Sequence, residues 1–195
     1  MKKKLLILID CQNDFITGTL ANPRAEAKIA NIVKKVKEHD GIIIATHDTH
    51  FTRLQVEANW PPAEGKAFED TMEGQKLKTV HCIKLTEGWE IQKDILAACQ
   101  EKNGDGPVKF HCIDKYTFGW DGWKEYLKQF DFDEVEICGF VAGICVDSNA
   151  TILRALYPNM PITVDAACTA GFGPDDEKAA YTCMKMKEID VINED

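Results

Sequence analysis

The feature that most constrains the fold of this chain is a series of short apolar runs, separated by segments with helical spacing. None of the runs approaches the roughly 18 apolar residues of a membrane-spanning helix. Short apolar runs of this kind are typical of strands buried on both faces of a sheet. There are six of them, at residues 5–9, 42–45, 108–113, 135–138, 162–164 and 189–192.

The clearest helical segment has an apolar stripe at intervals of three and four residues between Ala25 and Val36, preceded by the cap and first-turn pair Asn22-Pro23. Strands that alternate with helices pair in parallel through right-handed crossovers. We therefore predict a three-layer α/β/α sandwich around a six-stranded, mostly parallel sheet. Further helices are expected at residues 89–102, 119–129, 143–157 and 175–187.

Length and charge limit the class of protein. A chain of 195 residues suits one domain, and we expect residues 1–195 to form a single unit. The net charge of −9 repels phosphate backbones and anionic lipid surfaces, so neither nucleic acid nor a membrane is an expected partner. Asp10 interrupts the first apolar run before it reaches the length of about 7–15 residues that a signal core needs. A soluble, cytoplasmic protein is the expectation.

The eight cysteines form no CxxC pair and no dense framework of a small secreted domain. This spacing favours reduced thiols and argues against a thiol redox protein. Most free cysteines behave as small buried apolar residues. A reactive cysteine must therefore be recognised by its surroundings.

The segment 51–80 differs from the rest of the chain because it has little apolar periodicity and contains Trp60-Pro61-Pro62. Long excursions of this kind in compact domains are usually functional or disordered. We expect this segment to be a lid or metal-binding loop that lies over a site.

Three residues near the carboxyl ends of predicted strands are candidates for chemistry, because ligands of open α/β sheets lie at those ends. Asp10 follows the first run, although a capping or turn role is the alternative. Lys115 follows the third run, where lysines are usually solvated. Cys145 lies near the predicted start of a helix, whose free N–H groups would lower the thiol pKa and could bind an oxyanion. A core cysteine, like Cys138, is the alternative.

A second constellation contains the Asp48-Thr49-His50 segment and His81. Carboxylate and imidazole groups suit zinc, iron or manganese. A DxH pair alone is a weak signal, and His47 at a strand end is as readily explained by a structural role. These residues are therefore compatible with a metal site, but their spacing alone does not establish one.

Taken in order, the motifs resemble the isochorismatase-like cysteine hydrolases, a family that includes the nicotinamidases. The resemblance runs from about residue 5 to residue 171, nearly the whole chain, and its first and last motifs are the most specific. The motifs are Leu8-Ile9-Asp10-Cys11-Gln12-Asn13-Asp14-Phe15, Thr46-His47-Asp48-Thr49-His50, His81-Cys82-Ile83-Lys84, Asp114-Lys115-Tyr116-Thr117-Phe118 and Gly139-Phe140-Val141-Ala142-Gly143-Ile144-Cys145-Val146.

The resemblance implies the isochorismatase-like hydrolase fold and a catalytic triad of Asp10, Lys115 and Cys145. It also implies a cis peptide between Phe140 and Val141, with an oxyanion bound by the backbone N–H groups of Val141 and Cys145. In the implied mechanism Asp10 takes the thiol proton, the Cys145 thiolate attacks an amide carbon, and a thioester is then hydrolysed.

For the nicotinamidases of this family, the resemblance further implies a divalent metal, zinc or alternatively iron or manganese, held by Asp48, His50 and His81. The fourth protein ligand varies between His and Glu. Residues 51–80 contain no histidine, and Glu73 is the residue that we expect. Phe15 would line the substrate pocket, with a core role as its alternative.

The implied activity is hydrolysis of a small amide, nicotinamide to nicotinate and ammonia. The resemblance is also compatible with association of the chain into homo-oligomers. The alternatives are a metal-independent hydrolase of another small amide or carbamoyl compound, and a non-catalytic binding protein that keeps the fold. Leu85 stands where the family commonly has glycine, and the segment between His50 and His81 is longer than usual. We therefore expect a pocket that differs in detail. Isochorismatases proper lack the nucleophilic cysteine and the metal ligands, which favours amide hydrolysis here.

Overall fold

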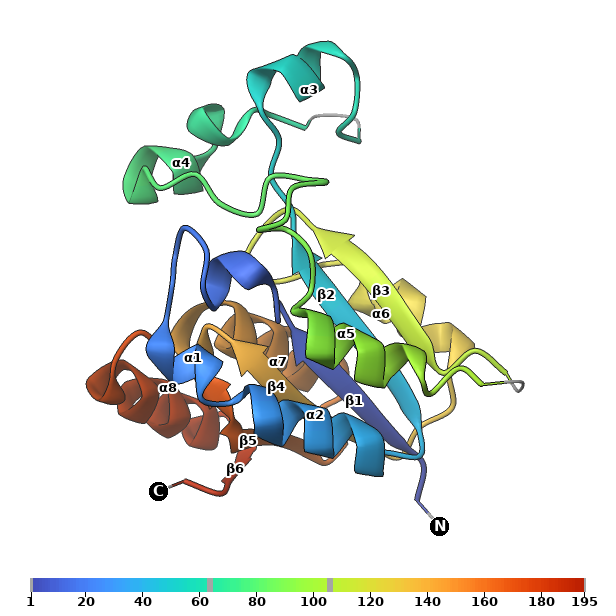
Figure 1. Ribbon diagram of the computed structural model, residues 1–195. Helices are drawn as coiled ribbons and strands as arrows, with labels where there is room; N and C mark the ends of the chain where they lie inside the picture. Colours follow the sequence, from blue (N-terminus) through green and yellow to red (C-terminus); the bar gives the residue numbers. More distant parts are fainter. Residues whose placement is uncertain (1, 63–64, 105–106, 195) are drawn as a thin grey trace.

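The computed structural model describes residues 2–62, 65–104 and 107–194, and its centre is one six-stranded parallel sheet (Figure 1). The strand order is β3-β2-β1-β4-β5-β6. The chain therefore starts in the middle of the sheet, adds β2 and β3 on one side of β1, and then adds β4, β5 and β6 on the other side. This confirms the predicted fold class. The strands are β1 (Lys4–Ile9), β2 (Ile42–Asp48), β3 (Phe110–Lys115), β4 (Glu134–Phe140), β5 (Ile162–Ala170) and β6 (Asp190–Ile192).

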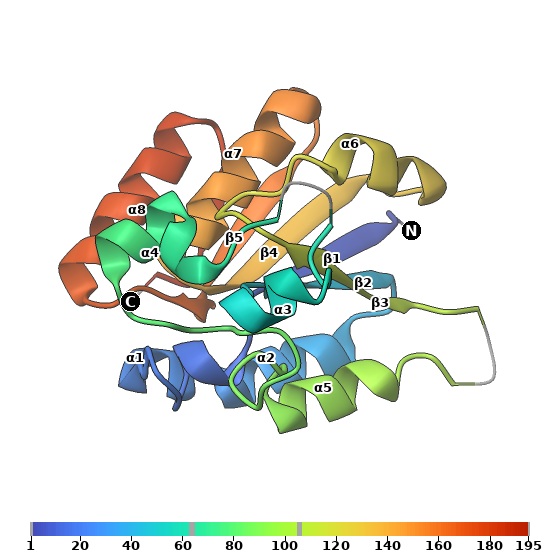
Figure 2. The ribbon, with the colours of Figure 1, turned by 90° about the horizontal axis from the view of Figure 1, so that it is seen from above.

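Helices cover both faces of the sheet (Figure 2). One face carries α1 (Pro23–Glu26), α2 (Ile29–Glu38) and α5 (Lys93–Gln100), and the other carries α6 (Trp123–Tyr126), α7 (Asp147–Leu156) and α8 (Pro174–Met186). Alternate side chains of β1 therefore enter two separate cores. Leu5, Ile7 and Ile9 pack on the side of α7 and α8, while Leu6 and Leu8 pack on the side of α2 and α5.

The boundaries of several elements differ from the prediction, and the α1–α2 stripe, β3 and β5 are three examples. The stripe between Ala25 and Val36 is divided between α1 and α2, because the chain turns at Ala27 and Lys28. β3 begins at Phe110, and Val108 is exposed. β5 continues to Ala170, well beyond the apolar run at its start, because the buried Asp165 is compensated by the Lys35 ammonium at 2.7 Å.

The segment 51–80 lies above the carboxyl ends of the strands (Figure 1). It is not structureless, because it contains α3 (Arg53–Glu57), a 3-10 turn η2 (Phe68–Asp70) and α4 (Met72–Leu77). Thr52 closes a capping box on α3, and the Thr71 hydroxyl caps α4. Its function as a lid stays a prediction. Within the described ranges, no helix is long and apolar enough to cross a bilayer.

Candidate active site

The three predicted catalytic residues meet above the middle of the sheet. Asp10 directly follows β1, and Cys145 lies in η4 (Ala142–Val146), a π-helical turn between β4 and α7. Lys115 is the last residue of β3 rather than a residue beyond it, in register with Asp48 of β2. The Lys115 ammonium is 2.7 Å from the Asp10 carboxylate and 3.6 Å from the Cys145 sulfur, and all three side chains are buried.

The Asp10 carboxylate is fixed by Thr46 of β2, which the sequence did not indicate as a site residue. The Thr46 hydroxyl donates to Asp10 Oδ1 at 2.6 Å and accepts from the Asp10 amide at 3.0 Å. Asp10 has a positive φ of 47°, a conformation that this pair of hydrogen bonds stabilises. The only available signal was position, since Thr46 lies two residues before Asp48 and so faces the same side of the strand.

The Cys145 turn is also held in place. The buried Asn149 side chain donates to the Cys145 carbonyl at 2.8 Å and accepts from the Trp123 indole at 2.8 Å. The Phe140–Val141 peptide is cis, as the resemblance implied. At Gly139, φ is 123°, and a Cβ atom there would lie 2.0 Å from the Ile9 carbonyl oxygen, so only glycine fits this close approach.

Burial is the largest single influence on the pKa of each of the three residues, but at Lys115 the neighbouring carboxylates together outweigh it. It raises the pKa of Asp10 to about 6, although the Lys115 charge opposes it. It also raises the pKa of the Cys145 thiol well above its usual value, against the lowering effect of Lys115. Burial acts to lower the pKa of Lys115, but the carboxylates of Asp10 and Asp48 hold it well above its usual value. The helix start was expected to lower the pKa of the Cys145 thiol, and burial instead raises it.

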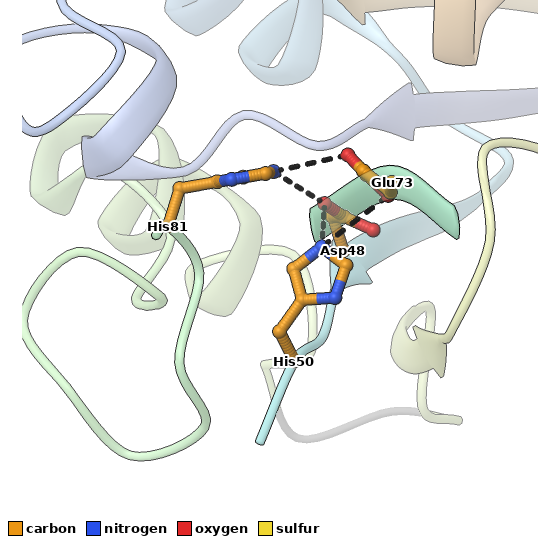
Figure 3. Close-up of side chains that lie close together, drawn as sticks. All are labelled: Asp48, His50, Glu73 and His81. Atoms are coloured by element: carbon orange, nitrogen blue, oxygen red, sulfur yellow. Dashed lines mark hydrogen bonds and ion pairs between the residues drawn. The ribbon is translucent and has the colours of Figure 1, made fainter. Parts of the chain in front are cut away.

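A metal-binding group lies beside the triad and contains all four residues named from the sequence (Figure 3). The imidazoles of His50 and His81 and the carboxylates of Asp48 and Glu73 point toward one another. Four imidazole–carboxylate distances lie between 3.1 and 3.6 Å. Tetrahedral zinc, with bonds of about 2.0–2.2 Å, places neighbouring donor atoms about 3.3–3.6 Å apart. The donor set and its spacing therefore fit a divalent metal.

Two contacts orient this group. The Thr79 carbonyl lies 2.9 Å from His81 Nδ1, which leaves Nε2 to face the other donors. Asp48 Oδ2 faces His50 and His81, while its Oδ1 lies 3.2 Å from the Lys115 ammonium. Burial lowers the pKa of His81, but Asp48 and Glu73 raise it overall, to about 10. Asp48 is therefore shared between the metal-binding group and the triad.

A cavity of about 140 Å³ connects the sulfur with the metal-binding group. Its wall is mostly apolar and includes Phe15, which was predicted to line it. His47 lies outside the metal-binding group, stacked on Trp89 with a centroid distance of 4.3 Å, and burial lowers its pKa to about 4. The cavity is lined by Phe15, Leu20, Asp48, Glu73, Lys76, Leu77, His81, Phe118, Val141, Ile144, Cys145 and Phe172.

Comparison with known proteins gives one family and many related structures. The Isochorismatase domain model matches residues 4–194. The nicotinamidase of Saccharomyces cerevisiae is 24% identical, over 97% of this chain and 99% of its own length. The nicotinamidase of Escherichia coli is also 24% identical, over 95% of this chain and 92% of its own length.

Three solved structures share the fold. The yeast nicotinamidase bound to the inhibitor nicotinaldehyde has a TM-score of 0.77 at 23% identity, over 98% of this chain and 100% of that chain. The nicotinamidase/pyrazinamidase of Bacillus subtilis has a TM-score of 0.77 at 21% identity, over 98% and 100%. The pyrazinamidase of Pyrococcus horikoshii in complex with zinc has a TM-score of 0.69 at 22% identity, over 98% and 99%.

Proposed function

The chain belongs to the isochorismatase family, and from that premise we propose that it is an amidohydrolase that converts nicotinamide to nicotinate and ammonia. The observation that carries the proposal is the cavity shared by the Cys145 sulfur and the metal-binding group. A small ring amide can face both at once. The two curated relatives named nicotinamidase support the same substrate class.

The first step is proton transfer from Cys145 to Asp10. With a pKa of about 6, Asp10 is mostly a carboxylate at neutral pH and is a suitable general base. Burial raises the pKa of the thiol well above its usual value, so a base is needed to form the thiolate. The Lys115 ammonium, 3.6 Å from the sulfur, stabilises the thiolate that forms.

The thiolate then adds to the carboxamide carbon. We assign the oxyanion to the backbone N–H groups of Val141 and Cys145, a contribution worth about 3–4 kcal/mol for each donor in comparable sites. Protonated Asp10 returns its proton to the departing ammonia and leaves a thioester on Cys145. Asp10 then takes a proton from water as the water oxygen adds to the thioester carbon. The C–S bond breaks to release nicotinic acid, which ionises to nicotinate, and Asp10 returns its proton to the departing Cys145 sulfur. The surrounding apolar wall, including Phe15, limits competing water.

We assign Asp48, His50, Glu73 and His81 as ligands of zinc, with iron or manganese as alternatives that the donors also suit. The relative from Pyrococcus horikoshii was solved with zinc. When bound, such a metal supplies a Lewis acid that can accept the lone pair of the ring nitrogen of the substrate. The residues of the triad carry out the proton and acyl transfers.

A direct test is ammonia release from nicotinamide and a panel of other small amides by the wild-type protein and by Cys145→Ala. We expect turnover of nicotinamide by the wild type and a loss of at least about 10³-fold in the variant. Cys183→Ala, which removes an exposed thiol, is the matched control and should keep full activity. Turnover by Cys145→Ala, or activity on other amides alone, would refute the proposal.

The cellular setting follows from the thiols. All eight cysteines are unpaired, which suits a reducing compartment, and we assign the protein to the cytoplasm. Homo-oligomerisation stays a prediction of the family resemblance.

A further inference from the structure

A short segment after β1 reaches both sides of the metal-binding group without contributing a ligand. Gln12 is fully buried, and its side-chain amide brackets the backbone of Asp48. Gln12 Nε2 donates to the Asp48 carbonyl at 2.9 Å, and Gln12 Oε1 accepts from the Asp48 amide at 2.8 Å. The same Nε2 donates to the Trp89 carbonyl at 2.8 Å. One side chain therefore fixes the peptide groups on both sides of the Asp48 Cα.

Asp14 acts in a similar way on the peptide that follows His81. The Cys82 amide donates to Asp14 Oδ2 at 2.7 Å, while Asp14 Oδ1 accepts from the Thr19 amide at 2.9 Å. Cys82 has a positive φ of 46°, so the chain turns sharply here. The Cys82 carbonyl accepts from the His50 amide at 3.0 Å. The Asp14 carboxylate therefore fixes the His81–Cys82 peptide, one residue before the peptide whose carbonyl accepts from the His50 amide.

Fixing these peptides matters because the four donors come from three separate parts of the chain. Asp48 ends β2, Glu73 lies on α4, and His81 lies in a connecting segment without regular structure. The carboxylates of Asp48 and Glu73 also repel each other when no cation lies between them. Residues that hold metal ligands in the bound geometry commonly change metal affinity by about 10–100-fold when they are replaced.

We propose that Gln12 and Asp14 are positioning residues that hold Asp48 and His81 in metal-binding geometry. The inference rests on the proposed metal site but not on the identity of the amide substrate. It separates these two residues from Asn13 between them. The Asn13 side chain donates to the Glu87 carbonyl at 2.8 Å, so it joins the segment after β1 to the region of Trp89, as Gln12 does. Unlike the side chains of Gln12 and Asp14, that of Asn13 makes no hydrogen bond, among the described residues, to a peptide next to a metal-binding residue.

The test measures the zinc dissociation constant by competition with a chromogenic chelator. Gln12→Met removes three hydrogen bonds at similar volume, and Asp14→Asn removes one of two acceptors with little change in shape. We expect zinc affinity to fall by about 10–100-fold in Gln12→Met and by a smaller factor in Asp14→Asn. Asn13→Ala, the matched control, should change it by less than about threefold.

A second readout separates positioning from general damage. The iodoacetamide reaction of Cys145, measured in zinc-free protein, should stay within about twofold of wild type in all three variants, because the triad is left intact. Wild-type zinc affinity in both Gln12→Met and Asp14→Asn, or an equal loss in Asn13→Ala, would overturn the inference. If Gln12→Met does not fold, Asp14→Asn decides it alone.

The test of the proposed substrate is independent of the test of the positioning role. A wild-type protein that binds one zinc but releases no ammonia from nicotinamide contradicts the proposed function and leaves the positioning role standing. A wild-type protein that hydrolyses nicotinamide, with variants of unchanged zinc affinity, contradicts only the positioning role.

Discussion

At the scale of single residues, the site depends on one buried cation between three groups. Lys115 faces the carboxylates of Asp10 and Asp48 and the sulfur of Cys145. Its charge lets two carboxylates remain ionised in a volume closed to solvent. A neutral residue at this position would leave Asp10 without a cation and Asp48 with only the imidazoles of His50 and His81.

Replacement of Lys115 by Met should therefore affect both activity and stability. We expect loss of nicotinamide hydrolysis and a decrease of about 3–5 kcal/mol in the free energy of unfolding, measured by urea denaturation at neutral pH. The decrease should shrink as the pH is lowered, because a protonated Asp10 needs no counter-ion. Lys84→Met breaks a partly exposed pair with Asp114 and should cost about 1 kcal/mol or less. Equal costs in the two variants would contradict this account.

The pH dependence of the reaction should report Asp10. Its pKa is raised by burial to about 6, so the fraction in the base form falls as the pH falls through that value. We expect kcat/KM for nicotinamide to decrease about tenfold per pH unit well below about pH 6, with zinc occupancy monitored throughout. A profile that stays flat down to about pH 5 would show that another group is the base.

At the scale of elements, the sequence identified the strands that are apolar throughout but not the elements that depend on tertiary contacts. β1, the first half of β2 and the second half of β4 are buried on both faces, which produces a continuous apolar run. The end of β5 was missed because Asp165 interrupts the apolar pattern. The burial of Asp165 depends on Lys35, which lies in α2. No local pattern contains that information.

The same limit applies to α4 and to the site. α4 has six residues and buries only Gly74, so it has no apolar stripe to recognise. The sequence suggested Asp10, Lys115 and Cys145 because they lie near strand ends, and Glu73 through the family resemblance. Thr46 and Gln12 contact distant segments, as Asn149 does through the Trp123 indole, and periodicity does not reveal such contacts.

The position of α4 gives a prediction about Gly74. A Cβ atom at Gly74 would lie 2.0 Å from the Phe68 carbonyl oxygen, so alanine forces α4 away from η2. Because α4 carries Glu73, we expect Gly74→Ala to weaken zinc binding by about tenfold, or about 1.4 kcal/mol, which lies within the usual overpacking cost of about 1–3 kcal/mol. Gln75→Ala, on the exposed side of the same helix, should leave the zinc dissociation constant unchanged. Unchanged affinity in Gly74→Ala would show that α4 adapts without moving Glu73.

At the scale of the whole molecule, the metal-binding group joins the segment 51–80 to the sheet. Asp48 and His50 follow β2, Glu73 lies on α4, and His81 follows the segment. A bound metal therefore adds a crosslink to the buried contacts that Phe51, Ala67 and Phe68 make, since α3 buries no residue and α4 only one. Asp48 Oδ1 contacts the Lys115 ammonium, so the metal-binding group is also connected to the triad.

Removal of the metal should consequently lower the thermal stability of the entire domain as well as its activity. At a free zinc concentration of about 100 times the dissociation constant, binding to the folded state alone contributes about 2.7 kcal/mol. For a chain of this length, that corresponds to a Tm increase of about 5–11 °C. We expect chelation to reverse the increase, and zinc to restore it, in thermal denaturation followed by circular dichroism. His81→Ala should show a much smaller response, because it keeps only three of the four donors. A wild-type Tm that is insensitive to zinc would mean that the four donors do not hold the metal together.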